Sequence, residues 1–167
     1  MKPGYPAILA LSSILLSGLA PAHAAGHDTR AIERGKYLSK VGGCNDCHTP
    51  AYMQNEGKVP EHLWLTGTAL GFQGPWGTSY PVNLRLYLGK LTEAQWLARA
   101  RQPMRPPMPW FNLKEMSDKD LVALYRYIRS LGPAGEPAPV AAAPGVPVAT
   151  PYIEFVPKNL PAKQASR

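Results

Sequence analysis

The stretch Cys44-Asn45-Asp46-Cys47-His48 holds both cysteines of this 167-residue chain, and the interpretation of the whole sequence depends on it. Two residues separate the thiols, and a histidine follows the second thiol directly. A zinc site would need four ligands, but the chain has no second cysteine pair. A thioredoxin-type redox pair would need a strand and a helix around it, and a disulfide closed over two residues is strained. These three interpretations explain the stretch poorly.

The spacing is instead typical of covalent attachment of a c-type haem. Each thiol can add across one vinyl group of the porphyrin to form a thioether, and one tight turn presents Cys44 and Cys47 to the two vinyls. The adjacent His48 can then direct its imidazole to the iron as the proximal ligand. Because the motif occurs once, the sequence predicts one haem c per chain.

The sixth iron ligand is predicted to be a methionine, because a thioether paired with histidine favours ferrous iron and raises the haem potential. Met108 is the first candidate. It lies in Pro106-Pro107-Met108-Pro109-Trp110, where the proline rings stiffen the backbone and lower the entropy cost of one loop shape. Met104 has a proline only before it and is the runner-up.

The other methionines and histidines are weaker candidates. Met116 falls at the start of a predicted helix, where core packing is its expected role. Met53 follows the attachment motif too closely to reach the opposite face of the haem. A bis-histidine iron would have to use His27, beside the predicted mature N-terminus, or His62, which is more typical of a surface loop. The candidate wall or propionate contacts of the haem are aromatic, and ordinary core packing explains each of them at least as well: Trp76, Tyr80, Trp96 and Trp110.

Residues 1–24 are predicted to be a secretory signal peptide. Lys2 gives a positive start, Ile8 to Leu19 form an apolar run, and Ala22-His23-Ala24 matches a small-x-small cleavage site. The apolar run is shorter than the roughly 20 residues that a bilayer span needs. We therefore expect export, cleavage after Ala24, and a soluble mature protein without a stable membrane span.

The chain is moderately basic, with 18 Lys and Arg residues against 11 Asp and Glu residues and a net charge of +7. Cleavage of the signal peptide would remove Lys2 alone and lower the charge by one. The cations are scattered and nothing resembles a nucleic-acid-binding module, so no nucleic-acid partner is expected. A solvated basic surface explains the charge most simply, and it would also suit an acidic protein face or an anionic membrane surface.

Helical periodicity predicts several helices joined by long Gly- and Pro-rich loops. Thr92 and Gln95 form a capping-box pattern for a helix over 92–101. The clearest helix starts at Ser117-Asp118 and ends at Gly132-Pro133. Shorter or less regular patterns predict helices over about 28–40 and 61–65. The rest of residues 49–90, and all of 102–116, are expected to be ordered loops.

Residues 133–167 form a predicted Pro/Ala-rich tail, with eight prolines and eight alanines among 35 residues. This composition favours extended chain with polyproline character and cannot form a core of its own. Only Pro151 to Phe155 is apolar enough to dock on the domain or on a partner. The predicted organisation is a signal peptide over 1–24, one domain over 25–132, and this tail.

Together these features resemble the class I cytochrome c family over about residues 28–132. The chain looks most similar to single-haem cytochrome subunits of bacterial periplasmic dehydrogenases. The matching segments are Gly35-Lys36-Tyr37, Pro75 to Thr78 followed by Asn83, Met108-Pro109-Trp110, and Met116 to Leu121. The resemblance strengthens the choice of Met108 over Met104.

The resemblance also implies an all-α, class I cytochrome c-like fold, with few helices around one haem. In that family the first and last helices cross closely at the haem edge, where a small residue on one meets an aromatic residue on the other. Gly35 and Tyr127 fit these two positions, with Leu124 and Ile128 beside them. The extended tail is an addition to this basic fold.

The expected function is electron transfer without substrate chemistry, by a soluble carrier or by the cytochrome subunit of a periplasmic redox complex. The expected partners are donor and acceptor proteins, with a dehydrogenase or a terminal oxidase as candidates. The alternative is a haem enzyme or gas sensor with a labile sixth ligand, although the sequence offers no convincing distal histidine. A third interpretation makes the tail a tether that recruits a partner.

Overall fold

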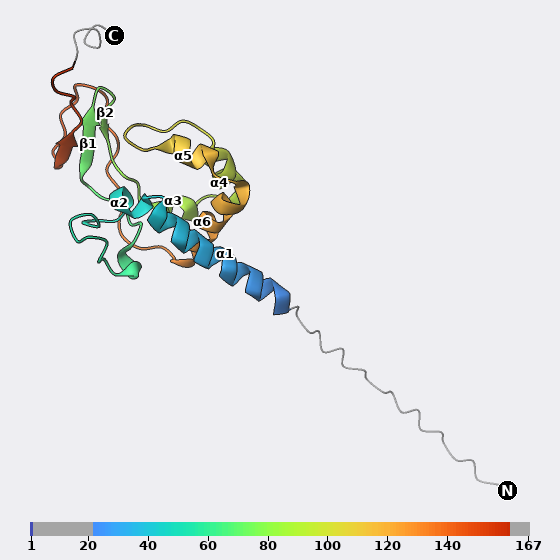
Figure 1. Ribbon diagram of the computed structural model, residues 1–167. Helices are drawn as coiled ribbons and strands as arrows, with labels where there is room; N and C mark the ends of the chain where they lie inside the picture. The colour runs from blue at the N-terminus through green and yellow to red at the C-terminus, as the bar shows by residue number, and fades with distance from the viewer. Residues whose placement is uncertain (2–21, 161–167) are drawn as a thin grey trace.

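The computed structural model describes Met1 and residues 22–160, and most of its regular structure is helical (Figure 1). The helices are α1 Ala22–Val41, α2 Cys44–His48, the 3-10 helix η1 Glu61–Leu63, α3 Leu84–Gly89, α4 Glu93–Ala100, α5 Trp110–Glu115 and α6 Asp118–Ser130. The strands are β1 Gly71–Gly74, β2 Gly77–Ser79 and β3 Tyr152–Glu154. The apolar run of the predicted signal peptide lies outside the described residues. Within the described part, no helix is both long and apolar enough to cross a membrane.

The two most regular helices are confirmed as α4 and α6. At the start of α4, Thr92 Oγ1 accepts a hydrogen bond from Gln95 N, and Gln95 Oε1 accepts one from Thr92 N. At the start of α6, Ser117 Oγ accepts a hydrogen bond from Asp120 N. The short helix expected over 61–65 is the 3-10 turn η1. Caps of this kind join residues three apart in the chain, which is why the sequence predicts them well.

Three sequence-based predictions need correction. Helix α1 begins at Ala22 instead of at about residue 28, because the alanines before Asp28 are strong helix formers and extend the helix. The loop predicted over 102–116 ends early, since Trp110–Glu115 is helix α5. The loop predicted over 49–90 contains α3 and a β1–β2 hairpin. Elements of three to six residues are too short for hydrophobic periodicity to reveal.

The core lies where α1 crosses α6. An ideal Cβ atom on Gly35 would be 2.6 Å from the Cβ atom of Tyr127, so the two helices meet at the positions that the resemblance implied. Leu124, Tyr127 and Ile128 are each at most 3% exposed, and burying one such side chain contributes about 2 kcal/mol. The remaining buried members of this core are Leu38, Trp64, Leu65, Leu88, Trp96, Ala100, Leu113, Leu121 and Ala123.

A small three-stranded sheet, which an all-α prediction does not include, lies beside the helices (Figure 1). Strand β1 pairs antiparallel with β2 and parallel with β3, with Phe72 opposite Ile153. The prediction that Pro151 to Phe155 can dock is confirmed, and its docking site is the domain itself. A two-stranded hairpin alone is marginal in water, so the third strand from the tail stabilises it.

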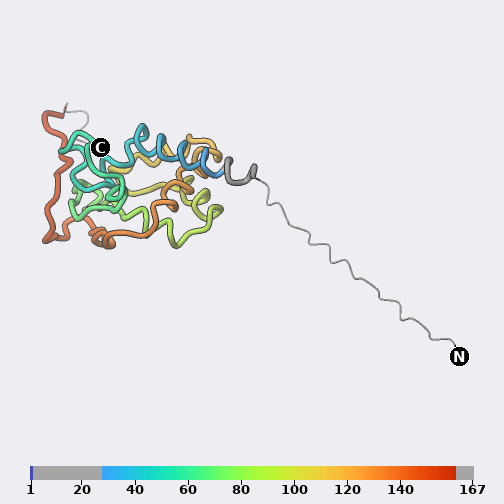
Figure 2. The backbone as a smooth tube through the Cα atoms, turned by 90° about the horizontal axis from the view of Figure 1, so that it is seen from below, coloured from blue at the N-terminus to red at the C-terminus, as the bar shows by residue number. Residues whose placement is uncertain are grey.

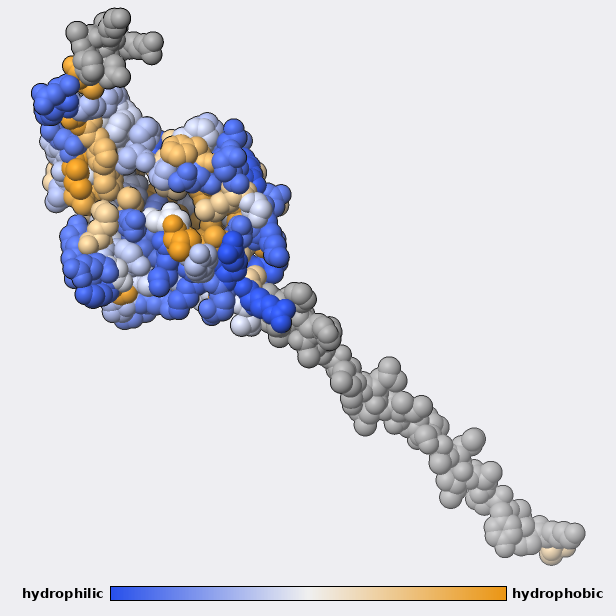
Figure 3. Space-filling view, in the orientation of Figure 1, coloured by the Kyte–Doolittle hydropathy of each residue, from blue (hydrophilic) through white to orange (hydrophobic). Residues whose placement is uncertain are grey.

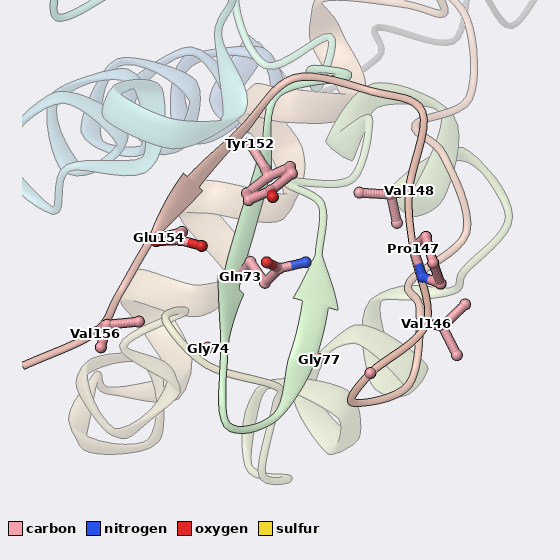
Figure 4. Close-up of a pocket in the computed structure, with 10 residues that line it drawn as sticks. Gln73, Gly74, Gly77, Val146, Pro147, Val148, Tyr152, Glu154 and Val156 are labelled. Atoms are coloured by element: carbon pink, nitrogen blue, oxygen red, sulfur yellow. The ribbon is translucent and has the colours of Figure 1, made fainter.

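The tail follows the surface of the domain from the end of α6 to the sheet, as Figures 1 and 2 show. Before it reaches β3, its residue Ala142 forms an antiparallel bridge with Thr78 on β2. The tail therefore contacts both edges of the hairpin (Figure 4). A cavity of about 390 Å³, lined among others by Gln73, Val146 and Tyr152, separates the hairpin from the arch of the tail.

Candidate functional site

Helix α2 is a single turn that carries all three side chains of the predicted attachment motif. It begins after Gly43, whose φ of 69° lies in the left-handed region that glycine adopts without strain. The two cysteines are free thiols, and both line one cavity together with His48. The turn thus presents two thiols and an imidazole to the same space, as the sequence predicts.

The cavity has a volume of about 400 Å³, within the range of ligand and cofactor sites. It lies between α2, the sheet and helices α3 to α6, and Figure 3 shows apolar surface in the hollow between the sheet and the helices. Most of its walls are apolar or aromatic side chains. These include Phe72, Tyr80, Val82, Leu84, Tyr87, Trp96, Leu113, Leu124 and Ile128.

His48 is fixed in orientation by the backbone. The residue is 7% exposed, and its Nδ1–H donates to the carbonyl oxygen of Val82 at 2.8 Å. Burial lowers the pKa of this imidazole, so the ring is neutral at pH 7. With the proton on Nδ1, the lone pair of Nε2 remains for a metal, and a carbonyl partner of this kind is typical of a ligating histidine.

The two thiols are poor candidates for redox or zinc chemistry. Burial raises the pKa of the Cys44 thiol to about 11, and it also raises the pKa of Cys47. A reactive or metal-binding cysteine needs a thiolate, which such an environment disfavours. In addition, no three His, Cys, Asp or Glu side chains of the described residues gather as a metal-binding cluster.

Three methionines line the cavity: Met104, Met108 and Met116. The structure therefore brings both candidate sixth ligands to the same space, and it adds Met116, for which the sequence predicts only core packing. Met53 is 54% exposed and His62 is also exposed, and neither contributes to the cavity wall. The side chain of His27 lies outside the described residues.

Two of the four aromatic residues predicted as wall contacts, Tyr80 and Trp96, line the cavity. The other two, Trp76 and Trp110, do not. The charged side chains in the lining are Arg99 and Arg105, and it contains no Asp or Glu. Sequence patterns gave no signal for these arginines, because about half of the domain separates them from the motif.

This donor set fits a haem. Two thiols face the cavity from one turn, a neutral imidazole offers Nε2, and thioethers line the same space. Apolar walls suit the porphyrin, and the two arginines suit its carboxylates. The fit rests on residues from seven separate helices and strands, which only the fold brings together.

Comparison with known proteins gives a consistent result. The chain is similar to the cytochrome c subunit of a quinone alcohol dehydrogenase from Gluconacetobacter polyoxogenes, with 27% identity over 135 residues, which is 74% of this chain and 27% of that protein. The corresponding subunit from Gluconobacter oxydans is 26% identical over 138 residues, covering 76% of this chain and 27% of that protein. The chain thus spans about a quarter of the length of these relatives.

A third relative is a nicotinate dehydrogenase subunit from Pseudomonas putida. It is 26% identical over 119 residues, which cover 65% of this chain and 9% of that protein. No solved structure gives a significant match.

The family model for cytochrome c matches residues 32–132, more than half of the chain. The match contains helix α2, the methionines that line the cavity, and α6. Proteins of this family bind haem c covalently and use it to transfer electrons. The chain is an electron-transfer protein that belongs to the cytochrome c family.

Proposed function

We propose that the chain carries one haem c, attached through Cys44 and Cys47, with His48 and Met108 as axial ligands. We further propose that it is exported to the periplasm and transfers electrons as the cytochrome subunit of a dehydrogenase complex. The observation that carries the first proposal is the convergence of these four side chains on one largely apolar cavity. The second is supported by the relatives, two of which are cytochrome c subunits of quinone alcohol dehydrogenases.

When bound, the haem supplies a one-electron centre, and the chain's residues set its properties. The Val82 carbonyl holds the His48 ring in one orientation and increases its basicity. The apolar walls exclude water, and a methionine thioether favours the ferrous state. Arg99 and Arg105 offer positive charge to the carboxylates of the porphyrin. None of these roles requires a substrate pocket.

The covalent attachment is tested by extraction of the purified holoprotein with acidified acetone. Thioether-bound haem stays with the protein, whereas a haem held only by its iron ligands passes into the acetone. A haemochrome assay should give one haem per chain. Cys44→Ser and Cys47→Ser should each leave a single thioether, which shifts the haemochrome absorption toward the red. Complete extraction from the wild type would overturn the proposed attachment.

The sixth ligand is tested with a matched pair of variants. Met108→Ala should abolish the weak ferric absorption at the red end of the spectrum that marks an iron–thioether bond. It should also lower the potential and allow carbon monoxide to bind the ferrous iron. Met104→Ala lies in the same cavity wall and should leave all three properties nearly unchanged. The opposite result would assign the ligand to Met104.

A further variant, Met116→Ala, covers the third methionine of the cavity wall. We expect it to retain the red absorption. If the wild type itself binds carbon monoxide rapidly, the sixth position is labile, and the haem enzyme or gas sensor becomes the better hypothesis.

Export and partnership have their own tests. Cell fractionation should recover the holoprotein in the periplasm, and N-terminal sequencing should begin at Ala25. Mild purification should recover a dehydrogenase with the cytochrome, and its substrate should reduce the haem in the purified complex. Recovery of the chain alone, with no reduction by any dehydrogenase fraction, would favour a free carrier.

A further inference from the structure

The segment that carries Met108 has few means of holding its own shape. Residues 102–109, here called the methionine loop, join α4 to α5 without helix or strand. Four of its eight residues are prolines, which have no backbone N–H. The loop can therefore accept hydrogen bonds but donates few, and it cannot form a regular ladder with a neighbour. Hydrogen bonds with groups outside the loop must therefore fix its position.

One such hydrogen bond comes from the hairpin. Ser79, on β2, is 9% exposed, and its Oγ donates to the carbonyl oxygen of Pro106 at 2.5 Å. Pro106 is two residues from Met108, and Ser79 and Met108 line the same cavity. This hydrogen bond thus links the methionine loop to the sheet two residues before Met108, the proposed ligand.

The tail provides the second set of hydrogen bonds that holds the methionine loop. Ala142 exchanges two backbone hydrogen bonds with Thr78, with N···O distances of 2.9 and 3.1 Å. Its carbonyl oxygen also accepts a hydrogen bond from the Arg105 guanidinium at 3.1 Å. One carbonyl of the tail therefore links β2 and the methionine loop. Its neighbour Ala141 lines the cavity together with Arg105 and Met108.

The tail is itself held firmly against the hairpin. Phe155 N donates to Gln73 O at 2.7 Å, and Gly71 N donates to Pro151 O at 2.8 Å, both along β1. Figure 4 shows the other arm of the tail passing along β2. There the approach is so close that a Cβ atom on Gly77 would lie 2.2 Å from Ala142 O. The tail pairs with both edges of the hairpin, and this pairing fixes the position of Ala142.

We propose that the hairpin and the tail form a clasp that positions Met108 at the iron, with Ser79 and Arg105 as its positioning residues. The proposal rests on the proposed ligation by Met108. Loss of either the Ser79–Pro106 or the Arg105–Ala142 hydrogen bond lets the methionine loop move, so the thioether leaves the iron more often. The tail would then have a role in setting the stability of the iron–sulfur bond, in addition to covering the edges of the hairpin.

Two substitutions test the clasp from its two sides. Ser79→Ala removes the donor to Pro106, and Ala142→Pro removes the backbone N–H that donates to Thr78 while leaving the tail in place. Ser130→Ala is the matched control, because Ser130 Oγ also donates to a backbone carbonyl, that of Tyr127 at 2.7 Å, away from the cavity. Each holoprotein is examined by its red ferric absorption and by the rate at which ferrous iron binds carbon monoxide.

We expect the carbon monoxide rate to rise about 2- to 10-fold in Ser79→Ala and Ala142→Pro, as loss of one hydrogen bond predicts. The red absorption should weaken in both. Ser130→Ala should match the wild type in rate and spectrum even where its melting temperature falls, because a purely structural loss does not free the ligand. If Ser79→Ala fails to yield holoprotein, Ala142→Pro alone tests the clasp, because it changes only the hydrogen bond between the tail and Thr78.

If Met108→Ala allows carbon monoxide to bind but Ser79→Ala and Ala142→Pro bind it no faster than the Ser130→Ala control, the clasp is wrong. The proposed ligation by Met108 then still stands. If Met108→Ala leaves the red absorption intact, Met108 is not the ligand, and both proposals are overturned. As a second comparison, a chain ending at Pro139 should bind carbon monoxide at least as fast as Ala142→Pro, because it loses the contacts of the tail with both edges of the hairpin. A chain ending at Pro157, which retains both arms of the tail, should behave like the wild type.

Discussion

An ideal Cβ atom on Gly35 would lie 2.0 Å from the carbonyl oxygen of Ala123, closer than any side chain can approach a backbone atom. The backbones of α1 and α6 are in contact at this point, and glycine is the residue that permits it. Because α2 follows α1 directly, the crossing also sets where the two cysteines and His48 stand relative to α6. The position of the site depends on this one contact.

Substitution of this glycine should therefore destabilise the fold. Gly35→Val forces the helices apart and should lower the free energy of unfolding by about 1–3 kcal/mol through overpacking. Gly89→Ala is the control, because a Cβ atom there meets nothing within 4 Å, so its melting temperature should be unchanged or slightly higher. Thermal unfolding of the holoproteins measures both. Equal behaviour of the two variants would mean that the helices do not cross at Gly35.

Loss of the proposed proximal ligand should have a larger effect than loss of any other cavity residue. His48→Ala removes the imidazole that the Val82 carbonyl orients at 2.8 Å, and the iron then lacks its strong-field nitrogen. We expect little or no stable holoprotein, measured as haem absorption per unit of purified chain. A normal yield with an unchanged low-spin spectrum would contradict the assignment of His48.

The buried cation Arg85 should be important for stability rather than for the haem. It is 7% exposed, it does not line the cavity, and its guanidinium donates to the carbonyls of His62, Leu131 and Gly132. Two of these carbonyls follow α6, where positive charge also complements the helix dipole. Burial lowers the pKa of Arg85, but the group stays charged at neutral pH.

Arg85→Met leaves three carbonyls without their donor and should destabilise the protein by about 2–4 kcal/mol, while the haem spectrum stays unchanged. The control is Arg34→Met, which removes a partly exposed ion pair with Asp120 and should cost less than about 1 kcal/mol. Denaturant unfolding measures both changes. If Arg34→Met proves as damaging as Arg85→Met, burial of the guanidinium is not what gives Arg85 its role.

Acid should weaken the contacts of α1 with its neighbours. The hydrogen bond from Lys36 lowers the pKa of Glu61, and the hydrogen bond from Arg34 lowers that of Asp120. In both cases the folded state holds the carboxylate charged at a pH where the unfolded chain binds a proton. Their stabilisation is therefore complete above the ordinary carboxyl pKa and is lost as the pH falls through the lower folded value.

The double variant Glu61→Gln with Asp120→Asn should accordingly lose less melting temperature between pH 6 and about pH 3 than the wild type. Glu56→Gln, which removes a carboxylate 78% exposed beside Lys58, is the control and should keep the slope of the wild type. A double variant with the same slope as the wild type would show that these two carboxylates do not contribute to acid sensitivity.

Local features of the sequence were sufficient for much of this structure. The spacing of Cys44, Cys47 and His48 predicts the turn that presents them, since all three lie within five residues. The caps at Thr92 and Ser117 predict where α4 and α6 begin, because a capping side chain bonds an amide only three residues away. The resemblance to class I cytochromes c further placed Gly35 against the last helix. Such inferences need no knowledge of long-range contacts.

Tertiary structure decided the rest. The Val82 carbonyl reaches His48 across 34 residues, and Ser79 reaches Pro106 across 27, so neither pairing has a signature in the sequence. The tail has the composition of an extended chain, but strand β1 and Thr78 give its backbone partners and make part of it a strand. A backbone hydrogen bond is independent of side-chain identity, and for this reason only the folded chain shows which segments it joins.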